Sequence, residues 1–503
     1  MTFRGVMAAL ESGTRDLSKF DELARAALAE GEEEAALRQL IPVAERSREP
    51  LLWQWAGLLQ RSLDEHESAI QSFAKAAQLA PNDAGIAHGQ ARVALEAGFD
   101  AVDLFLRARA LAPGDGAVAL GLAAARNAVG EGALAAEELR TLVERAPAWT
   151  AGHEQLAQLL STLGEKKRAT ESLEHALAKF PREPALWLSL FRIDLLREDY
   201  VALRRDIGRA QSAGVPPPAL AVHCAIAAAE LDREPVPDVL FKVALPDGDR
   251  QLDVWRIRHL LRVGSIEEAL SLVDRGLASD WAWSIWPYAS LAWRMAGNDR
   301  STWLEGDPRI VQVTDLTPAL PPLGQLADVL RSLHIAKGEY VDQSVRGGTQ
   351  TDGPLLSRID PTIRQLRRAI VGAVESYVAQ LPEPDPQHPL LSQRRDRRIR
   401  FSGSWSVRLR GRGRHANHVH PQGWISSALY ISLPPRAAAD QQDAGWLTFG
   451  EPPRDLGINL PPWRKVEPKA AYLVLFPSWM WHGTVPFFEG ERLTVAFDVR
   501  PPI

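Results

Sequence analysis

Three histidines near the C-terminus have the types and spacing of a metal site. His418 and His420 are two positions apart, so their side chains share one face if the segment is extended. His482 follows after a second apolar, strand-like run. Imidazole binds iron, zinc and copper, and three ligands on one face leave coordination positions open. The sequence therefore predicts a metal centre with three protein ligands and room for a further molecule.

A second pair of residues suits a carboxylate. Arg492 and Thr494 alternate with the apolar residues Leu493 and Val495, which is the pattern of a half-buried strand. A guanidinium can hold both oxygens of a carboxylate, and a neighbouring hydroxyl can add a hydrogen bond. An unpaired buried charge is very costly. If this face points into the protein, we expect it to need an anionic partner.

The order of these residues resembles the iron- and 2-oxoglutarate-dependent oxygenases, over roughly residues 306–503. The closest match is a subgroup with His-x-His-Pro, then Trp-hydrophobe-Ser and a strand with Tyr, seen here from His418 to Tyr430. The resemblance implies a double-stranded β-helix (jelly roll) and hydroxylation of a substrate C–H bond. It also implies Fe(II) held by His418, His420 and His482, and 2-oxoglutarate held by Arg492 and Thr494, with Tyr430 adding a hydrogen bond.

One position departs from the wider superfamily, in which Asp or Glu usually stands where this chain has His420. Three neutral imidazoles raise the charge of the site by one unit, and both ligand sets can hold Fe(II). A second interpretation is that His420 only orients a ligand and that His415 or Asp443 completes the set. Residues considered as substrate contacts or as supports for the ligands are His415, Asn417, Trp424, Ser426 and Arg346.

Two other functions stay open at this stage. Three histidines around zinc with one open position would activate water for hydrolysis, although a hydrolase has no need of the Arg492 and Thr494 pair. The chain is alternatively a non-catalytic, repeat-based interaction module with a degenerate metal-binding barrel. The missing carboxylate and the long repeat array favour this last hypothesis.

Residues 1–306 are predicted to form an all-α solenoid. Proline-terminated helical patterns recur about every 34 residues, clearest over residues 50–181. Trp53, Gly57 and Phe73 stand at positions that define a tetratricopeptide repeat. Such arrays usually bind a peptide or protein on their concave face, and the alternative is that the array dimerises the protein or supports the second domain. A tryptophan cluster from Trp281 to Trp303 is expected to close the array against that domain.

Residues 307–503 change character. Residues 307–390 read as helices and linkers, and residues 391–503 as the core of an antiparallel β-barrel, which together make an α+β domain. Gly411 and Gly413 predict a turn between a strand over 404–410 and the histidines. The arginine-rich run 394–400 is interpreted as a solvated face, or as a basic approach that steers anions.

Composition limits the remaining possibilities. A chain of 503 residues favours two or three domains. The net charge of −5 argues against a general nucleic-acid binder, and the single cysteine, Cys224, fits a reducing compartment. Residues 1–10 lack the apolar run of a signal peptide, and no long apolar stretch follows. We therefore expect a cytoplasmic protein without a membrane or nucleic-acid partner.

Overall fold

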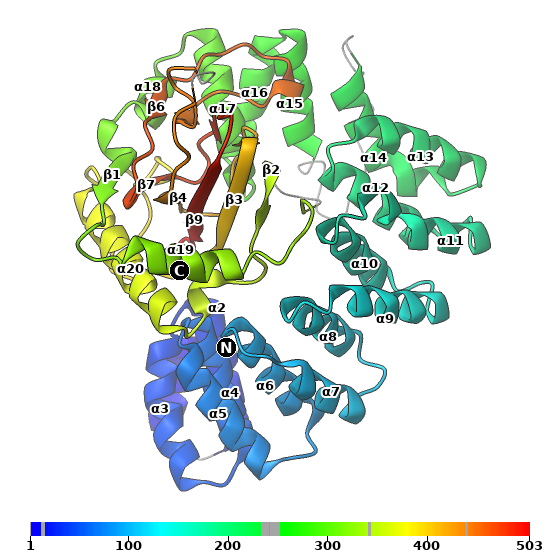
Figure 1. Ribbon diagram of the computed structural model, residues 1–503, viewed down its shortest axis with the longest axis vertical. Helices are drawn as coiled ribbons and strands as arrows, with labels where there is room; N and C mark the ends of the chain where they lie inside the picture. Colours follow the sequence, from blue (N-terminus) through cyan, green and yellow to red (C-terminus); the bar gives the residue numbers. More distant parts are fainter. Residues whose placement is uncertain are drawn as a thin grey trace.

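The computed structural model describes residues 2–11, 16–232, 241, 252–340, 344–437 and 441–502. Gln343, which begins the Gly-rich segment around Arg346, lies outside the described residues. A helical half is followed by a half built on two β-sheets, as the sequence predicts (Figure 1). Within the described residues, no helix has both the length and the apolar character of a membrane span.

The N-terminal half consists of antiparallel helix pairs, which confirms the predicted repeat architecture. A helix pair also precedes Ser47, before the range in which the repeat pattern is clearest, and Pro217 begins a further helix. The described helices are α1 (Phe3–Glu11), α2 (Leu17–Glu30), α3 (Glu33–Arg46), α4 (Pro50–Ser62), α5 (His66–Leu79), α6 (Ala84–Glu96), α7 (Val102–Leu111), α8 (Gly116–Ala128), α9 (Gly132–Arg145), α10 (Thr150–Thr162), α11 (Glu171–Lys179), α12 (Pro184–Leu196), α13 (Tyr200–Ser212), α14 (Pro217–Leu231), α15 (Asp253–Val263), α16 (Ile266–Leu277), α17 (Ala282–Ala296) and α18 (Arg300–Glu305).

Small residues allow the helices of neighbouring repeats to pack closely. Phe73 is fully buried between Gly57 of α4 and Gly89 of α6. A Cβ atom would meet the Phe73 ring at 2.6 Å from Gly57 and at 2.3 Å from Gly89. Any larger side chain at either glycine would push the ring out of the core. The repeat pattern of the sequence thus has a direct packing cause.

The C-terminal half contains a six-stranded and a three-stranded antiparallel sheet, with the strand orders β1-β7-β4-β9-β3-β2 and β6-β5-β8. Its predicted helices are α19 (Leu323–Ser332) and α20 (Pro361–Gln380). The strands are β1 (Gln312–Asp315), β2 (Val345–Gln350), β3 (Phe401–His415), β4 (Ile425–Ser432), β5 (Leu447–Phe449), β6 (Arg464–Val466), β7 (Tyr472–Pro477), β8 (His482–Thr484) and β9 (Glu491–Val499).

The solenoid curves around the β-sheets (Figure 1), and the turns at one of its edges contact loops, a helix and one strand of the C-terminal half. These turns join the two helices of a pair, so the contacts recur at roughly the repeat spacing. The pairs are Glu32 with Arg397, Asp64 with Arg367, Ala97 with Ile359, Thr162 with Lys337, and Glu198 with Arg346. One edge of the array therefore supports the second half, which is the alternative role considered for it.

The arginine-rich run takes part in this contact. Arg400 makes two hydrogen bonds of 2.6 Å to the carboxylate of Glu33, whose side chain is 1% exposed. Arg398 lies 2.6 Å from Glu65. The interpretation of the run as a solvated face is wrong for Arg400, because its side chain is only 13% exposed and is paired with a buried carboxylate. Arg394, paired with Asp396, and Arg398 are exposed and fit the solvated interpretation.

The tryptophan cluster both closes the array and lines a groove. Trp293 is fully buried, as the sequence predicts, but Trp283, Trp286 and Trp303 line an open cavity. One hydrophobic core includes residues of α15 to α18 and of both sheets. The division of the chain at residue 306 stays a prediction, since packing is continuous across it.

Candidate metal centre

Strand β3 leads directly into the histidine motif. The predicted turn at Gly411 and Gly413 is wrong, because β3 continues to His415. The glycines lie where the register between β2 and β3 shifts. A Cβ on Gly413 would meet the backbone oxygens of Arg410 at 2.5 Å and of Gly347 at 2.9 Å. Close backbone approach, and not chain reversal, explains glycine at this position.

His418 and His482 pair directly across the two segments. Each backbone N–H donates to the other residue's carbonyl, at 2.9 and 3.0 Å. His420 follows in extended chain, and its N–H donates to the carbonyl of Ser478 at 2.8 Å. One ligand atom from each of the three histidines lies within 4.8 Å of the others. The structure therefore brings together the predicted trio in a group that could hold a metal ion.

Hydrogen bonds orient all three rings. His418 Nδ1 lies 2.8 Å from the carbonyl oxygen of Ala416, and His482 Nδ1 lies 2.9 Å from that of Met480. His420 Nδ1 lies 2.7 Å from the Asp498 carboxylate. Because these oxygens can only accept, each Nδ1 carries a proton, and in the neutral imidazole the lone pair is then on Nε2. Three oriented Nε2 atoms are suitable ligands for a divalent metal ion.

Burial keeps two of the imidazoles neutral. It lowers the pKa of His418 to about 3, and it lowers the pKa of His482 well below its usual value. Burial also disfavours the charged form of His420, but the charge and hydrogen bond of Asp498 outweigh it and raise the pKa of His420. Neutral imidazole is the form that binds a metal. His418 and His482 are therefore already in the metal-binding form, whereas His420 would have to give up its Nε2 proton, if it carries one, to bind a metal.

Asp498 was missed as a site residue. It lies on the same face of β9 as Arg492 and Thr494, which was the available signal in the sequence. Besides His420, its carboxylate accepts a hydrogen bond from Ser426 Oγ at 2.5 Å. A carboxylate is therefore present at the site, but it touches a predicted ligand instead of replacing it.

Arg492, Thr494 and Tyr430 line the same cavity as the three histidines. Arg492 is 2% exposed and donates to the carbonyl of Gly445 at 3.0 Å and to Thr484 Oγ1 at 3.1 Å. Its Nε and the Tyr430 hydroxyl have no hydrogen-bond partner among the described residues. Burial lowers the pKa of Arg492 and raises that of Tyr430. These unsatisfied donors fit a bound carboxylate.

The other candidates take supporting or distant positions. His415 lines the cavity, but the ligand group formed by described residues does not include it. Ser426 holds Asp498. Asn417 donates to the carbonyl of Pro452, and Trp424 donates to that of Leu390. Arg346 and Asp443 form ion pairs elsewhere, with Glu198 at 3.6 Å and with Lys465 at 2.6 Å.

Comparison with known families agrees with this geometry. Residues 403–498 match the family described as "Putative 2OG-Fe(II) oxygenase", and residues 51–83 match "Tetratricopeptide repeat". No curated protein matches the chain. The protein therefore carries a tetratricopeptide repeat region and a domain of this 2-oxoglutarate and iron oxygenase family.

Solved structures resemble parts of the chain. A tetratricopeptide repeat protein from Parabacteroides merdae is 16% identical, with a TM-score of 0.32, and the match covers 42% of this chain and 85% of that one. A Pseudomonas putida prolyl-4-hydroxylase is 16% identical, with a TM-score of 0.26, and the match covers 38% of this chain and 92% of that one.

Proposed function

We propose that the protein is an Fe(II)- and 2-oxoglutarate-dependent dioxygenase that hydroxylates a peptide or protein side chain. The observation that carries this proposal is a single cavity lined by three histidines and a buried arginine. Neither a zinc hydrolase nor a plain binding module gives a reason for an incompletely paired guanidinium beside the metal-ligand trio. A carboxylic cosubstrate would provide its missing partner.

The residues have distinct tasks in this proposal. His418, His420 and His482 would hold Fe(II) through Nε2. Arg492 and Thr494 would bind the distal carboxylate, and the protonated Tyr430 would donate a hydrogen bond to it. When bound, iron and 2-oxoglutarate would supply an oxidation by O2 in which one oxygen atom enters the succinate formed with loss of CO2 and the other enters the hydroxylated substrate. Apolar Leu447 and Phe476 line the cavity and exclude water.

The repeats would contribute to substrate capture. A cavity of about 490 Å³ lies between the inner helices α6 and α8 and the segment that follows α19. Phe99 and Ile335 line it and are 49% and 38% exposed. Tetratricopeptide arrays commonly bind peptides on this face. An apolar cavity shared by both halves supports the capture of a peptide or protein, in addition to the supporting role of the array's edge.

Anaerobic titration with Fe(II) and then 2-oxoglutarate tests the proposal. The chelate should produce a visible metal-to-ligand charge-transfer band. His482→Ala should abolish the band by removing a ligand. Arg492→Ala should leave metal binding intact and weaken 2-oxoglutarate binding about 100-fold, equivalent to about 3 kcal/mol.

Arg410→Ala is the matched control, because Arg410 is exposed on the neighbouring strand. It should behave like the unmodified protein. Absence of the band in protein that binds iron would contradict the proposal and favour the non-catalytic module. Tight 2-oxoglutarate binding by Arg492→Ala would refute the assigned role of the arginine.

A further inference from the structure

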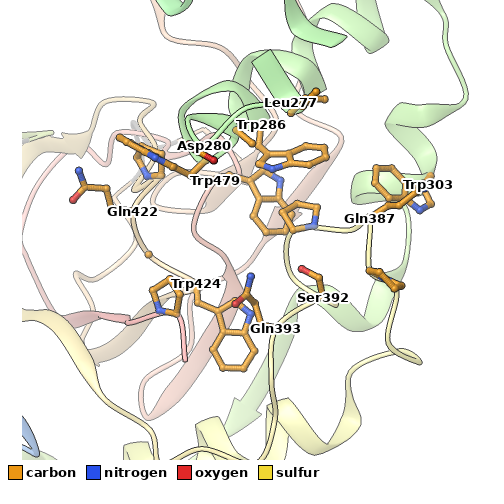
Figure 2. A pocket seen from close by; sticks show the side chains of 18 of the residues that line it. Leu277, Asp280, Trp286, Trp303, Gln387, Ser392, Gln393, Gln422, Trp424 and Trp479 are labelled. Carbon is orange, nitrogen blue, oxygen red and sulfur yellow. The ribbon is translucent and has the colours of Figure 1, made fainter. Parts of the chain in front are cut away.

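A groove of about 1150 Å³ lies between the end of the solenoid and the β-sheets, apart from the metal cavity. Figure 2 shows the side chains around it. We call it the tryptophan groove and define it by Trp283, Trp286, Trp303, Trp424, Trp479 and Asp280. The first three indoles come from α17 and α18, whereas Trp424 and Trp479 are buried and come from the β-sheet half.

The floor of the groove belongs to the loops that carry the metal-ligand trio. Trp424 comes four residues after His420, and Trp479 comes three residues before His482. The two loops are joined by backbone hydrogen bonds, from His420 N–H to the carbonyl of Ser478 at 2.8 Å and from Ser478 N–H to that of Trp424 at 3.2 Å. A molecule bound in the groove would thus lie against the segments that set the position of the metal site.

The charges that line the groove indicate what it binds. Asp274 and Asp280 are both exposed, and Arg300 is the one cationic side chain among the described lining residues. Arg300 is already paired with Asp274 at 2.6 Å. Asp280 has no ion-pair partner in the described part of the chain. The groove thus presents indole faces beside an uncompensated carboxylate.

Arg300 shows how such a surface holds a guanidinium. Its Cζ lies 4.1 Å from the ring centroid of Trp293, while its Nη1 donates to Asp274. The ring quadrupole attracts the cation, and the carboxylate fixes its orientation. Trp283, Trp286 and Asp280 offer the same combination of groups to a cation from outside the chain.

We propose that the tryptophan groove docks an arginine-containing segment of the protein substrate, with a guanidinium against the indoles of Trp283 and Trp286 and paired with Asp280. That the bound segment belongs to the substrate rests on the oxygenase function proposed above. A proline-rich peptide or an oligosaccharide would also stack on indoles, but neither would gain from the carboxylate. The charge of the groove therefore favours the basic peptide.

The test uses the full chain without metal or 2-oxoglutarate, so that its outcome does not depend on catalysis. The probe is a fluorescein-labelled peptide of alternating glycine and arginine, compared by fluorescence anisotropy with the same peptide in which citrulline replaces arginine. Citrulline keeps the size and removes the charge. We expect the arginine peptide to bind about tenfold more tightly, as a cation–π contact reinforced by a carboxylate implies.

Two variants locate the binding. Asp280→Asn and Trp283→Ala should each weaken binding of the arginine peptide about fivefold to tenfold. Asp103→Asn is the control, because this exposed aspartate on α7 lies outside the groove and also removes one negative charge. Because Asp280 is exposed, Asp280→Asn should fold normally. Lost binding by this variant would therefore not be due to misfolding.

Equal binding of the citrulline peptide, of a proline-rich peptide or of an oligosaccharide would overturn the proposal. So would unchanged binding by both groove variants, which would indicate general attraction to an acidic protein. If the arginine peptide binds as expected but the iron and 2-oxoglutarate band is absent, docking stands and the oxygenase function fails. If the band is present and the peptide result is negative, only the docking proposal fails.

Discussion

The Asp498 carboxylate lies 2.7 Å from Nδ1 of His420. The contact fixes the ring tautomer, because the carboxylate can only accept and the imidazole must donate. It also places a negative charge next to the three imidazoles, which are neutral in the form that binds a metal. The three histidines and Asp498 together then have the same charge as the usual set of two histidines and one carboxylate. The negative charge is still present, but it lies on a residue that contacts His420 and not on a ligand.

Replacing Asp498 with asparagine should therefore weaken metal binding. We expect Asp498→Asn to lose about 10–100-fold in Fe(II) affinity, the usual effect of removing a carboxylate that orients a ligand. Anaerobic competition with a chromophoric chelator measures this affinity. Ser426→Ala, which removes only one hydrogen bond to Asp498, should have a smaller effect. Asp328→Asn is the charge control because its side chain is 80% exposed, and equal affinity in Asp498→Asn and this control would refute the role.

Gly483 should tolerate no side chain. A Cβ atom there would lie 1.9 Å from Asn417 Oδ1. Asn417 directly precedes His418, and Gly483 directly follows His482. Gly483→Ala should displace the backbone pairing of these histidines and weaken Fe(II) binding about tenfold, with little change in overall stability. Metal titration combined with circular dichroism separates the two effects. Gly372→Ala is the control, since that position has open space, and normal metal binding by Gly483→Ala would contradict the expectation.

The contact between Arg400 and Glu33 should hold the first repeats in place. Arg400→Ala leaves a buried carboxylate without its cation, which costs about 3–5 kcal/mol. We expect faster amide hydrogen exchange in α2 and α3. Arg394→Ala should change exchange little, because its ion pair with Asp396 is exposed and screened by solvent. Similar exchange in both variants would show that the pair does not anchor the solenoid.

Glu96 should make the stability of the solenoid depend on acid pH. Burial disfavours its charged form, but hydrogen bonds from His66 and Arg61 outweigh this and lower the pKa of Glu96 from 4.5 to about 2. A lowered carboxyl pKa gives stability that is present above about pH 4.5 and is lost as the pH falls toward 2. At neutral pH it amounts to roughly 3 kcal/mol.

Urea unfolding of the unmodified protein and of Glu96→Gln measures this contribution. The difference in unfolding free energy should stay constant from about pH 7 to pH 5 and shrink below pH 4.5. Glu137→Gln is the control, because its side chain is 63% exposed in its pair with Arg140. A difference that grows on acidification would have the wrong sign for this mechanism.

Periodicity and residue chemistry were sufficient to predict the fold class and several of the residues that line the cavity. Alternation along β9 placed Arg492 and Thr494 on one face, and both line the cavity with the three histidines. The repeat period predicted the helix pairs. These inferences succeed because they depend on side chains that are close in sequence. Assignment of the histidines as ligands stays a prediction.

Contacts between distant segments could not be read in this way. The two glycines before the histidines resemble a turn signal, yet they accommodate β2 against β3. The pairing of Arg400 with Glu33 requires knowledge of how the solenoid curves. The tryptophan groove likewise forms only where α17, α18 and the metal-site loops meet.

The edge of the solenoid that contacts the C-terminal half has a consequence for biosynthesis. Glu32 and Glu33 leave the ribosome long before Arg397 and Arg400, so the repeats must exist for a time without their ionic partners. N-terminal units generally fold first. Docking of the repeats onto the C-terminal half, however, requires contacts between residues that are very far apart in the sequence. We therefore expect the repeats to fold early as a separate array. They should dock onto the C-terminal half only after the last strand has been synthesised.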